Sequence, residues 1–212
     1  MDELRTFDVV IPAHRLALRA GDLLVVAHHD GEALHRLELR GRRGGSRPAR
    51  PSCPLETVLL DELRRYFAGE RVRFSVPLAR VSHAKHRKNG DRQLAGKAVE
   101  DSWGRRQVPV PIFPADVAAT PFQRAVWDSL LAIPYGETRS YGDVARAIGK
   151  PGAARAVGRA CGANPWPIIV PCHRVVGADG ALGGYSAGLE WKRLLLELEG
   201  KRRRSASHGT SP

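Results

Sequence analysis

The stretch Asn164-Pro-Trp-Pro-Ile-Ile-Val-Pro-Cys-His-Arg-Val175 decides how this chain is organised. Its β-branched run at residues 168–170 predicts a buried strand, because such side chains pack well on a pleated surface. Pro171 has a fixed φ angle and predicts a stiff turn directly after that strand. Cys172 is then expected at the edge of the core, where its thiol is available for chemistry.

Cys172 has two interpretations. A single cysteine most often packs as a small buried hydrophobe. Here His173 and Arg174 follow it directly, and a thiolate is favoured by neighbouring cationic or proton-accepting groups. We therefore predict that Cys172 is a nucleophile. Adjacent side chains of an extended backbone point to opposite faces, so we expect its proton to reach His173 through a water molecule rather than by direct contact.

The signature Pro171-Cys-His-Arg-Val175 resembles the active-site motif of the O6-alkylguanine-DNA alkyltransferases, also called methylated-DNA-protein-cysteine methyltransferases. The resemblance is close over residues 120–200 and looser over residues 1–80. It implies an α+β fold with an N-terminal RNase H-like domain of sheet and helix over residues 1–80. It further implies a mainly helical, DNA-binding alkyltransferase domain over residues 119–200, with a helix-turn-helix and the active-site cysteine.

Two segments lie outside that pattern. Residues 81–118 are basic and rich in proline, and we interpret them as a linker or insert longer than the connection in relatives. Residues 201–212 form a basic tail that contains serine, for which we predict disorder. The sequence assigns neither segment a role.

Composition limits the class of protein. The chain has 212 residues and 42% hydrophobic content, which is typical of an ordinary globular protein. Its apolar runs are shorter than the roughly 18 residues that span a bilayer, and the first residues lack the pattern of a signal peptide. We therefore expect a cytoplasmic protein. A net charge of +12 predicts attraction to polyanions, without separating DNA from RNA or an anionic membrane.

The three cysteines are odd in number and widely spaced, so we predict no disulfide framework. Some members of the resembled family carry an N-terminal zinc ion, but the spacing of His28, His29 and Cys53 does not match such a site. We interpret these three as strand and loop residues and expect no metal.

The N-terminal part predicts a small antiparallel sheet with a helix on it. Alternating apolar residues indicate strands at residues 7–11, 23–27 and 37–39, and a fourth at residues 74–78. Apolar residues at helical spacing from Leu55 to Phe67 predict a helix that ends at Gly69.

The C-terminal part begins with a helix-start signature. Thr120, Pro121 and Gln123 are placed as a cap, a first-turn proline and the partner of a capping box. Pro134 is expected to stop this helix. Its predicted apolar face consists of Phe122, Ala125, Val126, Ser129 and Leu130.

Two short helices are predicted next, at residues 141–148 and 153–163, around the Gly-Pro turn at residues 149–152. The second is rich in alanine and glycine, which suits close approach to the backbone or groove of a partner. Tight packing against another helix explains the same composition equally simply. We further predict a hairpin turn at residues 178–180, a glycine-rich loop at 183–188 and a helix at 189–198 closed by Gly200.

The resemblance assigns a role to each of five residues. Cys172 would attack the alkyl carbon, and His173 would take the thiol proton through water. Glu199 would orient and stabilise the His173 imidazole. Tyr141 would push on a DNA phosphate and donate a proton toward the departing base, and Asn164 would tie the recognition helix to the cysteine turn.

The resemblance also implies the DNA-contacting residues. Arg155 would fill the gap left by a flipped nucleotide, although an ordinary solvent-exposed arginine is the alternative. The small residues Ala153 and Ala154 would let the same helix approach the DNA closely. The base pocket would be lined by Pro167, Val175, Tyr185 and Ser186. The chain departs from the family pattern at Arg159, Cys161 and Ala187.

The implied function is DNA repair by direct reversal. The protein would act as a monomer on double-stranded DNA that contains O6-alkylguanine, with one irreversible transfer per molecule and no cofactor. The preferred alkyl group, and activity on O4-alkylthymine, stay open. Two other classes are a non-enzymatic lesion-binding relative, which would lack Cys172, and a helix-turn-helix transcription factor, which would normally carry base-reading polar residues and a dimer element.

Overall fold

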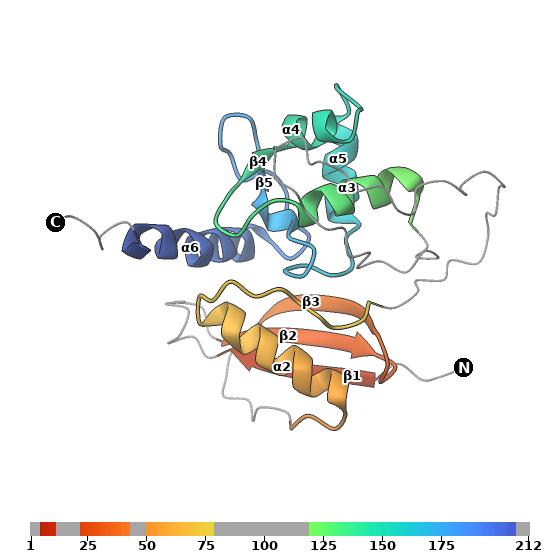
Figure 1. The fold of residues 1–212 in the computed structure, drawn as a ribbon, viewed down its shortest axis with the longest axis vertical. Helices are drawn as coiled ribbons and strands as arrows, with labels where there is room; N and C mark the ends of the chain where they lie inside the picture. The colour runs from red at the N-terminus through yellow and green to blue at the C-terminus, as the bar shows by residue number, and fades with distance from the viewer. Residues whose placement is uncertain (1–4, 12–21, 43–49, 79–118, 207–212) are drawn as a thin grey trace.

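The computed structural model describes residues 5–11, 22–42, 50–78 and 119–206. These residues form a mixed α/β fold with two parts, a sheet with one helix and a mainly helical part that lies beside it (Figure 1). The segment 81–118, interpreted above as a linker or insert, lies outside the described residues.

The N-terminal part is a three-stranded antiparallel sheet in the order β1-β2-β3, formed by β1 (Arg5–Ile11), β2 (Asp22–His29) and β3 (Leu34–Arg42). The three predicted strands are confirmed, and each is longer than predicted. Helix α2 (Pro54–Phe67) packs on this sheet and ends just before Gly69, as predicted. The core between sheet and helix includes Phe7, Val9, Val25, Ala27, Leu37, Leu39, Leu59 and Leu63.

The predicted fourth strand at residues 74–78 is wrong. Within this segment only Leu78 pairs with the sheet, in an isolated bridge to Leu34. Pro77 has no N–H to donate to a ladder, and the Ser75 N–H donates instead to Glu62 Oε1 at 2.8 Å. Val76 and Leu78 are buried and Phe74 is half-buried, but the three residues belong to an irregular segment.

Helix α3 (Pro121–Leu131) begins with the predicted capping box between Thr120 and Gln123. It ends before Pro134, also as predicted. The predicted apolar face is partly wrong, because Ala125 is exposed and the buried residues are Val126, Trp127 and Leu130. The buried face of α3 therefore includes Trp127, which was not predicted. The Trp127 Nε1–H donates to the carbonyl of Ala160 at 2.9 Å.

Helices α4 (Tyr141–Ala147) and α5 (Ala154–Gly162) follow as the two predicted short helices, and they pack against each other and against α3. Ser140 and Asp143 form a capping box at the start of α4. Ser140 also belongs to β4 (Arg139–Ser140), which pairs in parallel with β5 (Val175–Val176). Val157, Ala160 and Cys161 form the buried face of α5, so its small residues do serve helix packing.

The predicted strand at residues 168–170 is wrong, although all three residues are buried. The prolines at 165, 167 and 171 interrupt any ladder, and the chain turns there with a Val170 N–H bond to the Trp166 carbonyl at 2.9 Å. Ile168 has a φ of 76°, a conformation that a β-branched residue rarely adopts. The turn leads into a 3-10 helix, η1 (Cys172–Arg174).

The last part of the chain also differs from prediction in two places. The turn at residues 178–180 is present, but only β5 flanks it, so there is no hairpin among the described residues. Helix α6 (Leu189–Ala206) runs through Gly200 and into the predicted disordered tail. A single glycine costs about 1 kcal/mol in a helix, which neighbouring turns can absorb. Residues 207–212 lie outside the described residues.

The two parts contact each other through the turn that precedes Cys172. Trp166 is fully buried, and its Nε1–H donates to the carbonyl of Leu34 in β3 at 2.9 Å. The Leu37 N–H donates to the Pro165 carbonyl, also at 2.9 Å. The N-terminal sheet therefore fixes the backbone that presents the cysteine. None of the helices formed by the described residues is both long and apolar enough to cross a bilayer.

Candidate active site

Cys172 is the first residue of η1 and is only 3% exposed. Its sulfur accepts a hydrogen bond from Asn164 Nδ2 at 3.2 Å. The same Nδ2 donates to the Val170 carbonyl at 2.9 Å, and Asn164 Oδ1 accepts from the Trp166 N–H at 3.0 Å. Asn164 follows α5 closely in the chain, so it links the end of that helix to the cysteine turn.

Glu199 lies on α6 and is 1% exposed, yet its carboxylate is fully supplied with donors. Oε1 lies 2.9 Å from His173 Nε2, 2.9 Å from Arg174 Nη2 and 2.7 Å from the Tyr66 hydroxyl. Oε2 accepts from Arg174 Nε at 2.9 Å and from the Gly136 N–H at 3.1 Å. A buried carboxylate with this many donors is stable in its ionised form.

This arrangement fixes the tautomer of His173. An ionised carboxylate can only accept hydrogen bonds, so Nε2 must carry the imidazole proton toward Glu199. Nδ1 is buried and has no hydrogen-bond partner among the described residues. The lone pair of Nδ1 is therefore available to accept a proton. Cys172, the residue that directly precedes His173, carries the thiol that could supply this proton.

Burial and hydrogen bonding act differently on the three titratable groups. Burial raises the pKa of the Cys172 thiol, against the opposite effects of Asn164 and Lys192. Burial also lowers the pKa of His173, opposed by Glu199. For Glu199, burial acts upward, but bonds from His173 and Arg174 hold its pKa far below the usual range. The resting site thus contains a neutral thiol, a neutral imidazole and a carboxylate, so the thiol needs a base to ionise.

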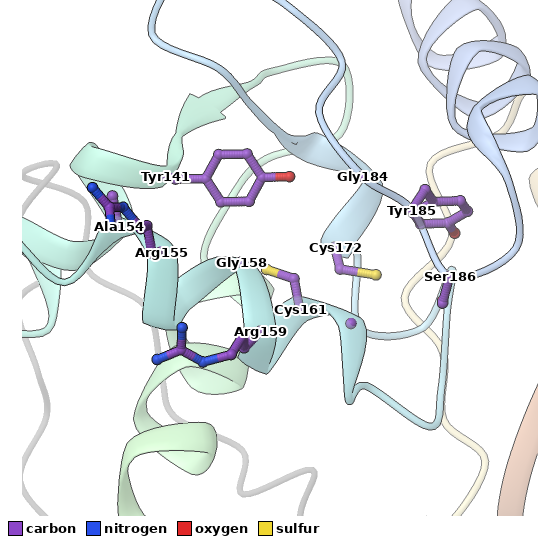
Figure 2. A pocket seen from close by; sticks show the side chains of 11 residues that line it. Tyr141, Ala154, Arg155, Gly158, Arg159, Cys161, Cys172, Gly184, Tyr185 and Ser186 are labelled. Carbon is purple, nitrogen blue, oxygen red and sulfur yellow. The ribbon is translucent and has the colours of Figure 1, made fainter.

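A pocket of about 550 Å³ opens above Cys172 between α5 and the loop before α6 (Figure 2). This volume suits a small aromatic ligand. The predicted residues Tyr185 and Ser186 line it, whereas the predicted residues Pro167 and Val175 are buried and are not among the lining residues. The lining residues are Tyr141, Ala154, Arg155, Gly158, Arg159, Cys161, Gly162, Cys172, Gly184, Tyr185 and Ser186.

Tyr141, the first residue of α4, extends its hydroxyl across the pocket toward the glycine-rich loop (Figure 2). That loop approaches it closely at Gly183, where an added Cβ would lie 2.9 Å from the tyrosine oxygen. Gly183 also has a φ of +62°, so both the backbone conformation and the contact with Tyr141 disfavour a larger residue there. Lys192 Nζ lies 3.5 Å from the Tyr141 hydroxyl and also donates to the loop carbonyl of Leu182.

The outer side of α5 carries the two exposed arginines of the pocket, Arg155 and Arg159, whose guanidinium groups point away from Cys172 (Figure 2). Ala153 immediately precedes the helix, and Ala154 lines the pocket mouth. Cys161 lines the same pocket as Cys172, and burial raises the pKa of its thiol to about 12.

Two groups near the Cys172–His173–Glu199 site had no predicted role, and a third has a different role from the one predicted. Arg174 was predicted to favour the Cys172 thiolate, whereas its guanidinium pairs with Glu199. Lys192 looked like an ordinary polar position on an amphipathic helix, but it is buried. Tyr66 belonged to the predicted apolar face of α2, and nothing in its local sequence indicates a contact with a residue 133 positions away.

The carboxylate of Glu199 leads to a prediction about stability. A group whose pKa is depressed by folding contributes stability above its unfolded pKa of about 4.3 and loses it as pH falls toward the folded value. Glu199→Gln should therefore destabilise the protein by about 3 kcal/mol at pH 7, as expected when one partner of a buried ion pair is removed. Urea unfolding should give a smaller difference between variant and wild type at pH 3. A difference that does not change with pH would contradict an ionised Glu199.

His29, Cys53 and Glu56 bring three possible metal ligands within 4.8 Å of one another. As predicted, His28 and His29 are strand residues and Cys53 precedes a helix. The Gly31 N–H donates to His29 Nδ1 at 3.1 Å, so the imidazole proton lies on Nε2, which is 2.9 Å from Glu56 Oε1. A metal ion would have to bind the lone pair of Nε2, but in this tautomer Nε2 carries a proton. We interpret the group as a polar link between β2 and α2.

The chain is similar to several known proteins. A family profile described as "6-O-methylguanine DNA methyltransferase, DNA binding domain" matches residues 121–201. The chain is 46% identical over 143 residues to a methylated-DNA-protein-cysteine methyltransferase of Mycobacterium tuberculosis, covering 68% of this chain and 64% of the relative. It is 59% identical over 86 residues to an inducible protein of the same name from Bacillus subtilis, covering 41% and 48%. These alignments thus span about half to two thirds of the curated relatives.

A solved structure extends the similarity to nearly the whole chain. The structure titled as Mycobacterium tuberculosis OGT in complex with DNA matches with a TM-score of 0.58 and 39% identity. The alignment covers 92% of this chain and 94% of that one. The mixed α/β fold is therefore shared along both parts of the molecule.

Proposed function

Because this chain belongs to the O6-methylguanine-DNA methyltransferase family, we propose that it repairs DNA by transferring the alkyl group of O6-alkylguanine to Cys172. The observation that carries the proposal is the arrangement around Cys172. The sulfur lies beneath a pocket large enough for a base, and the Glu199–His173 pair beside it leaves His173 Nδ1 as a proton acceptor. Such an arrangement generates a thiolate on demand.

The proposed transfer is an in-line displacement. The thiol proton of Cys172 passes through a water molecule to His173 Nδ1, and the imidazolium that forms is stabilised by Glu199. The sulfur then attacks the alkyl carbon, a carbon–sulfur bond forms, and the bond from that carbon to guanine O6 breaks. Guanine leaves with the bonding electron pair, and Tyr141 supplies the proton that neutralises it. The thioether product has no second step, so each molecule acts once and needs no cofactor.

A base that is buried in duplex DNA must be extruded before the sulfur can reach it. We propose that α4 and α5 are a helix-turn-helix that lies on double-stranded DNA, with Ala153 and Ala154 at the closest approach and Arg155 inserted in place of the flipped nucleotide. The pocket at the inner side of α5 would then receive the base against Tyr185 and Ser186. The net charge of +12 favours this partner.

The same proposal covers the organisation of the chain. We assign residues 1–80 to an RNase H-like domain and residues 119–200 to the alkyltransferase domain, with α6 continuing beyond it. The described cysteines are free thiols, which suits a reducing compartment such as the cytoplasm. The protein is proposed to act as a monomer, because a single chain supplies the pocket, the nucleophile and the base. A purely lesion-binding role is disfavoured by the nucleophile itself.

Arg155→Ala separates base extrusion from chemistry. If this side chain occupies the space left by the flipped nucleotide, it acts only on duplex DNA, where unstacking costs a few kcal/mol. The variant should transfer from duplex O6-methylguanine about 10- to 100-fold more slowly than wild type, and nearly normally from a free O6-alkylguanine base. The measurement is the single-turnover rate at saturating protein on both substrates, with a labelled alkyl group.

Arg159→Ala is the matched control, because Arg159 lies one turn further along the exposed side of α5. If Arg159 contacts a phosphate, its replacement by alanine should lower the affinity for all DNA and flatten the salt dependence of binding. It should cause no selective loss of transfer rate on duplex DNA. An equal loss of rate on duplex and free base in Arg155→Ala would remove its proposed role. Absence of transfer by the wild-type protein from either substrate would refute the proposed function.

A further inference from the structure

Tyr66 brings the N-terminal part of the molecule into contact with the catalytic groups. It lies on the same face of α2 as Leu59 and Leu63, at positions i, i+4 and i+7, so its ring belongs to the core between helix and sheet. Because it lies near the end of α2, its hydroxyl reaches beyond the sheet. That end of α2 lies next to α6 in Figure 1. The Tyr66 side chain is only 1% exposed.

The hydroxyl of Tyr66 lies 2.7 Å from Glu199 Oε1 and 3.4 Å from His173 Nε2. Its single proton has one suitable acceptor. His173 Nε2 already carries a proton directed at Glu199, whereas Glu199 is an acceptor on both oxygens. Tyr66 therefore donates to Glu199, and this is a short, charge-assisted hydrogen bond.

Aromatic neighbours hold the Tyr66 ring in place. It makes edge-to-face contacts with Phe67 and Tyr135, whose ring centroids are 5.3 Å and 6.0 Å away, and a tilted contact with Phe74 at 6.0 Å. Burial raises the pKa of Tyr66 well above its usual value, with Glu199 acting in the same direction, so the phenol stays protonated. A rigid, permanently protonated donor can set the position and basicity of the carboxylate that it contacts.

Resting on the proposed function, we propose that Tyr66 is a positioning residue for alkyl transfer, through which the N-terminal domain orients Glu199 and sets the proton affinity of His173. The N-terminal domain is then part of the catalytic apparatus and not only a support for the cysteine turn. Tyr66 touches neither the substrate nor the sulfur. It acts by supplying one of the three donors to the Glu199 oxygen that holds the imidazole.

The proton affinity of His173 depends on several charged and titratable groups that face the Glu199–His173 pair. Besides Tyr66 from α2, they are Cys172 and Arg174 from η1, Lys192 from α6, Tyr135 from the loop after α3 and Tyr185 from the loop before α6. All of these remain in a Tyr66→Phe variant. A change in titration behaviour in that variant is therefore due to the lost hydroxyl.

Tyr66→Phe removes the donor and keeps the ring. Glu199 should become more basic without this hydrogen bond, hold the His173 proton more strongly and raise the His173 pKa. The Glu199 carboxylate also loses a donor that fixes its position, so it should orient the imidazole less well. The single-turnover rate should therefore fall on the order of tenfold, which corresponds to the free energy of one charge-assisted hydrogen bond. The acidic limb of the pH–rate profile should also move to higher pH. The loss should be equal on duplex DNA and on a free O6-alkylguanine base, and the Kd for duplex DNA should stay unchanged.

Phe74→Leu is the matched control, because it removes a ring contact from Tyr66 and leaves the hydroxyl in place. This variant should lower the thermal stability without moving the acidic limb of the pH–rate profile. A Tyr66→Phe protein with the rate and pH profile of wild type would overturn the proposal. So would a loss of rate in both variants with an unmoved pH limb, because that result indicates a purely structural tyrosine.

Site-specific replacement of Tyr66 by a ring-fluorinated tyrosine tests the proposal if Tyr66→Phe does not fold. The more acidic phenol donates a stronger hydrogen bond, lowers the basicity of Glu199 and should move the pH limb in the opposite direction, to lower pH. An unmoved limb would again overturn the assignment. Wild-type protein is measured in the same assay, so a failure of the proposed function appears there as absence of transfer, separately from a failure of the Tyr66 assignment.

Discussion

Cys172→Ser is expected to abolish alkyl transfer while leaving the affinity for DNA nearly unchanged. A serine hydroxyl is far harder to ionise than a thiol, and oxygen is a poorer nucleophile toward an alkyl carbon. Loss of a catalytic nucleophile typically lowers the rate on the order of 10⁵-fold or more, so no product should accumulate. DNA binding should persist, because the exposed arginines of α5 lie away from the sulfur. The measurement is transfer from labelled duplex together with a binding titration.

The other two cysteines provide controls for this result. Cys161 lines the same pocket, but its thiol is neutral at pH 7 because burial raises its pKa to about 12. Cys53 precedes α2 in the N-terminal part. Replacement of either by serine should leave one alkyl group transferred per molecule. Transfer that persists in Cys172→Ser and disappears in Cys161→Ser would assign the nucleophile to Cys161.

His173→Ala and Glu199→Gln should each slow transfer by about 10²- to 10⁴-fold, the usual contribution of a positioned base. The double variant should be little slower than the slower single variant. His173 Nε2 and Glu199 Oε1 are 2.9 Å apart and act on one proton, so the two groups fail as a unit. The measurement is a double-mutant cycle of single-turnover rates for the wild type, the two single variants and the double variant. Strictly additive losses in activation free energy would indicate two independent roles.

The pH dependence of the wild-type rate follows from the same pair. Transfer needs a neutral His173, and burial lowers the pKa of this imidazole. The rate should therefore rise with pH through an acidic limb and reach a plateau, with the limb below the ordinary histidine value of about 6.5. His173→Ala should lose this limb and gain rate only at alkaline pH, where the thiol ionises without a base. A wild-type limb above the ordinary histidine value would contradict the buried neutral imidazole.

Features determined by local chemistry were predictable from the sequence. The capping box that begins with Thr120 depends on residues three positions apart, so the start of α3 was identified correctly, and the predicted start of α4 at residue 141 also agrees with the structure. The end of α2 at Gly69 followed from a glycine in the left-handed region. The assignment of Cys172 as the nucleophile, made because His173 and Arg174 follow it directly, stays a prediction.

Features determined by packing at a distance were not predictable. The β-branched residues 168–170 favoured a strand, but three prolines and contacts with β3 hold them in a turn. Gly200 was predicted to end α6, whereas the helix continues to Ala206. Val175 was assigned to the base pocket by resemblance, whereas it is fully buried in the core. The contact of Tyr66 with Glu199 joins residues far apart in sequence, which no local pattern encodes.

Alkyl transfer to Cys172 is tested by mass spectrometry of the intact protein after incubation with an excess of duplex DNA that contains O6-methylguanine. Each molecule should gain one methyl group in place of one hydrogen, and longer incubation should add no more. Peptide mapping should localise the methyl group to Cys172. A protein of unchanged mass, or a methyl group found on another residue, would contradict alkyl transfer to Cys172.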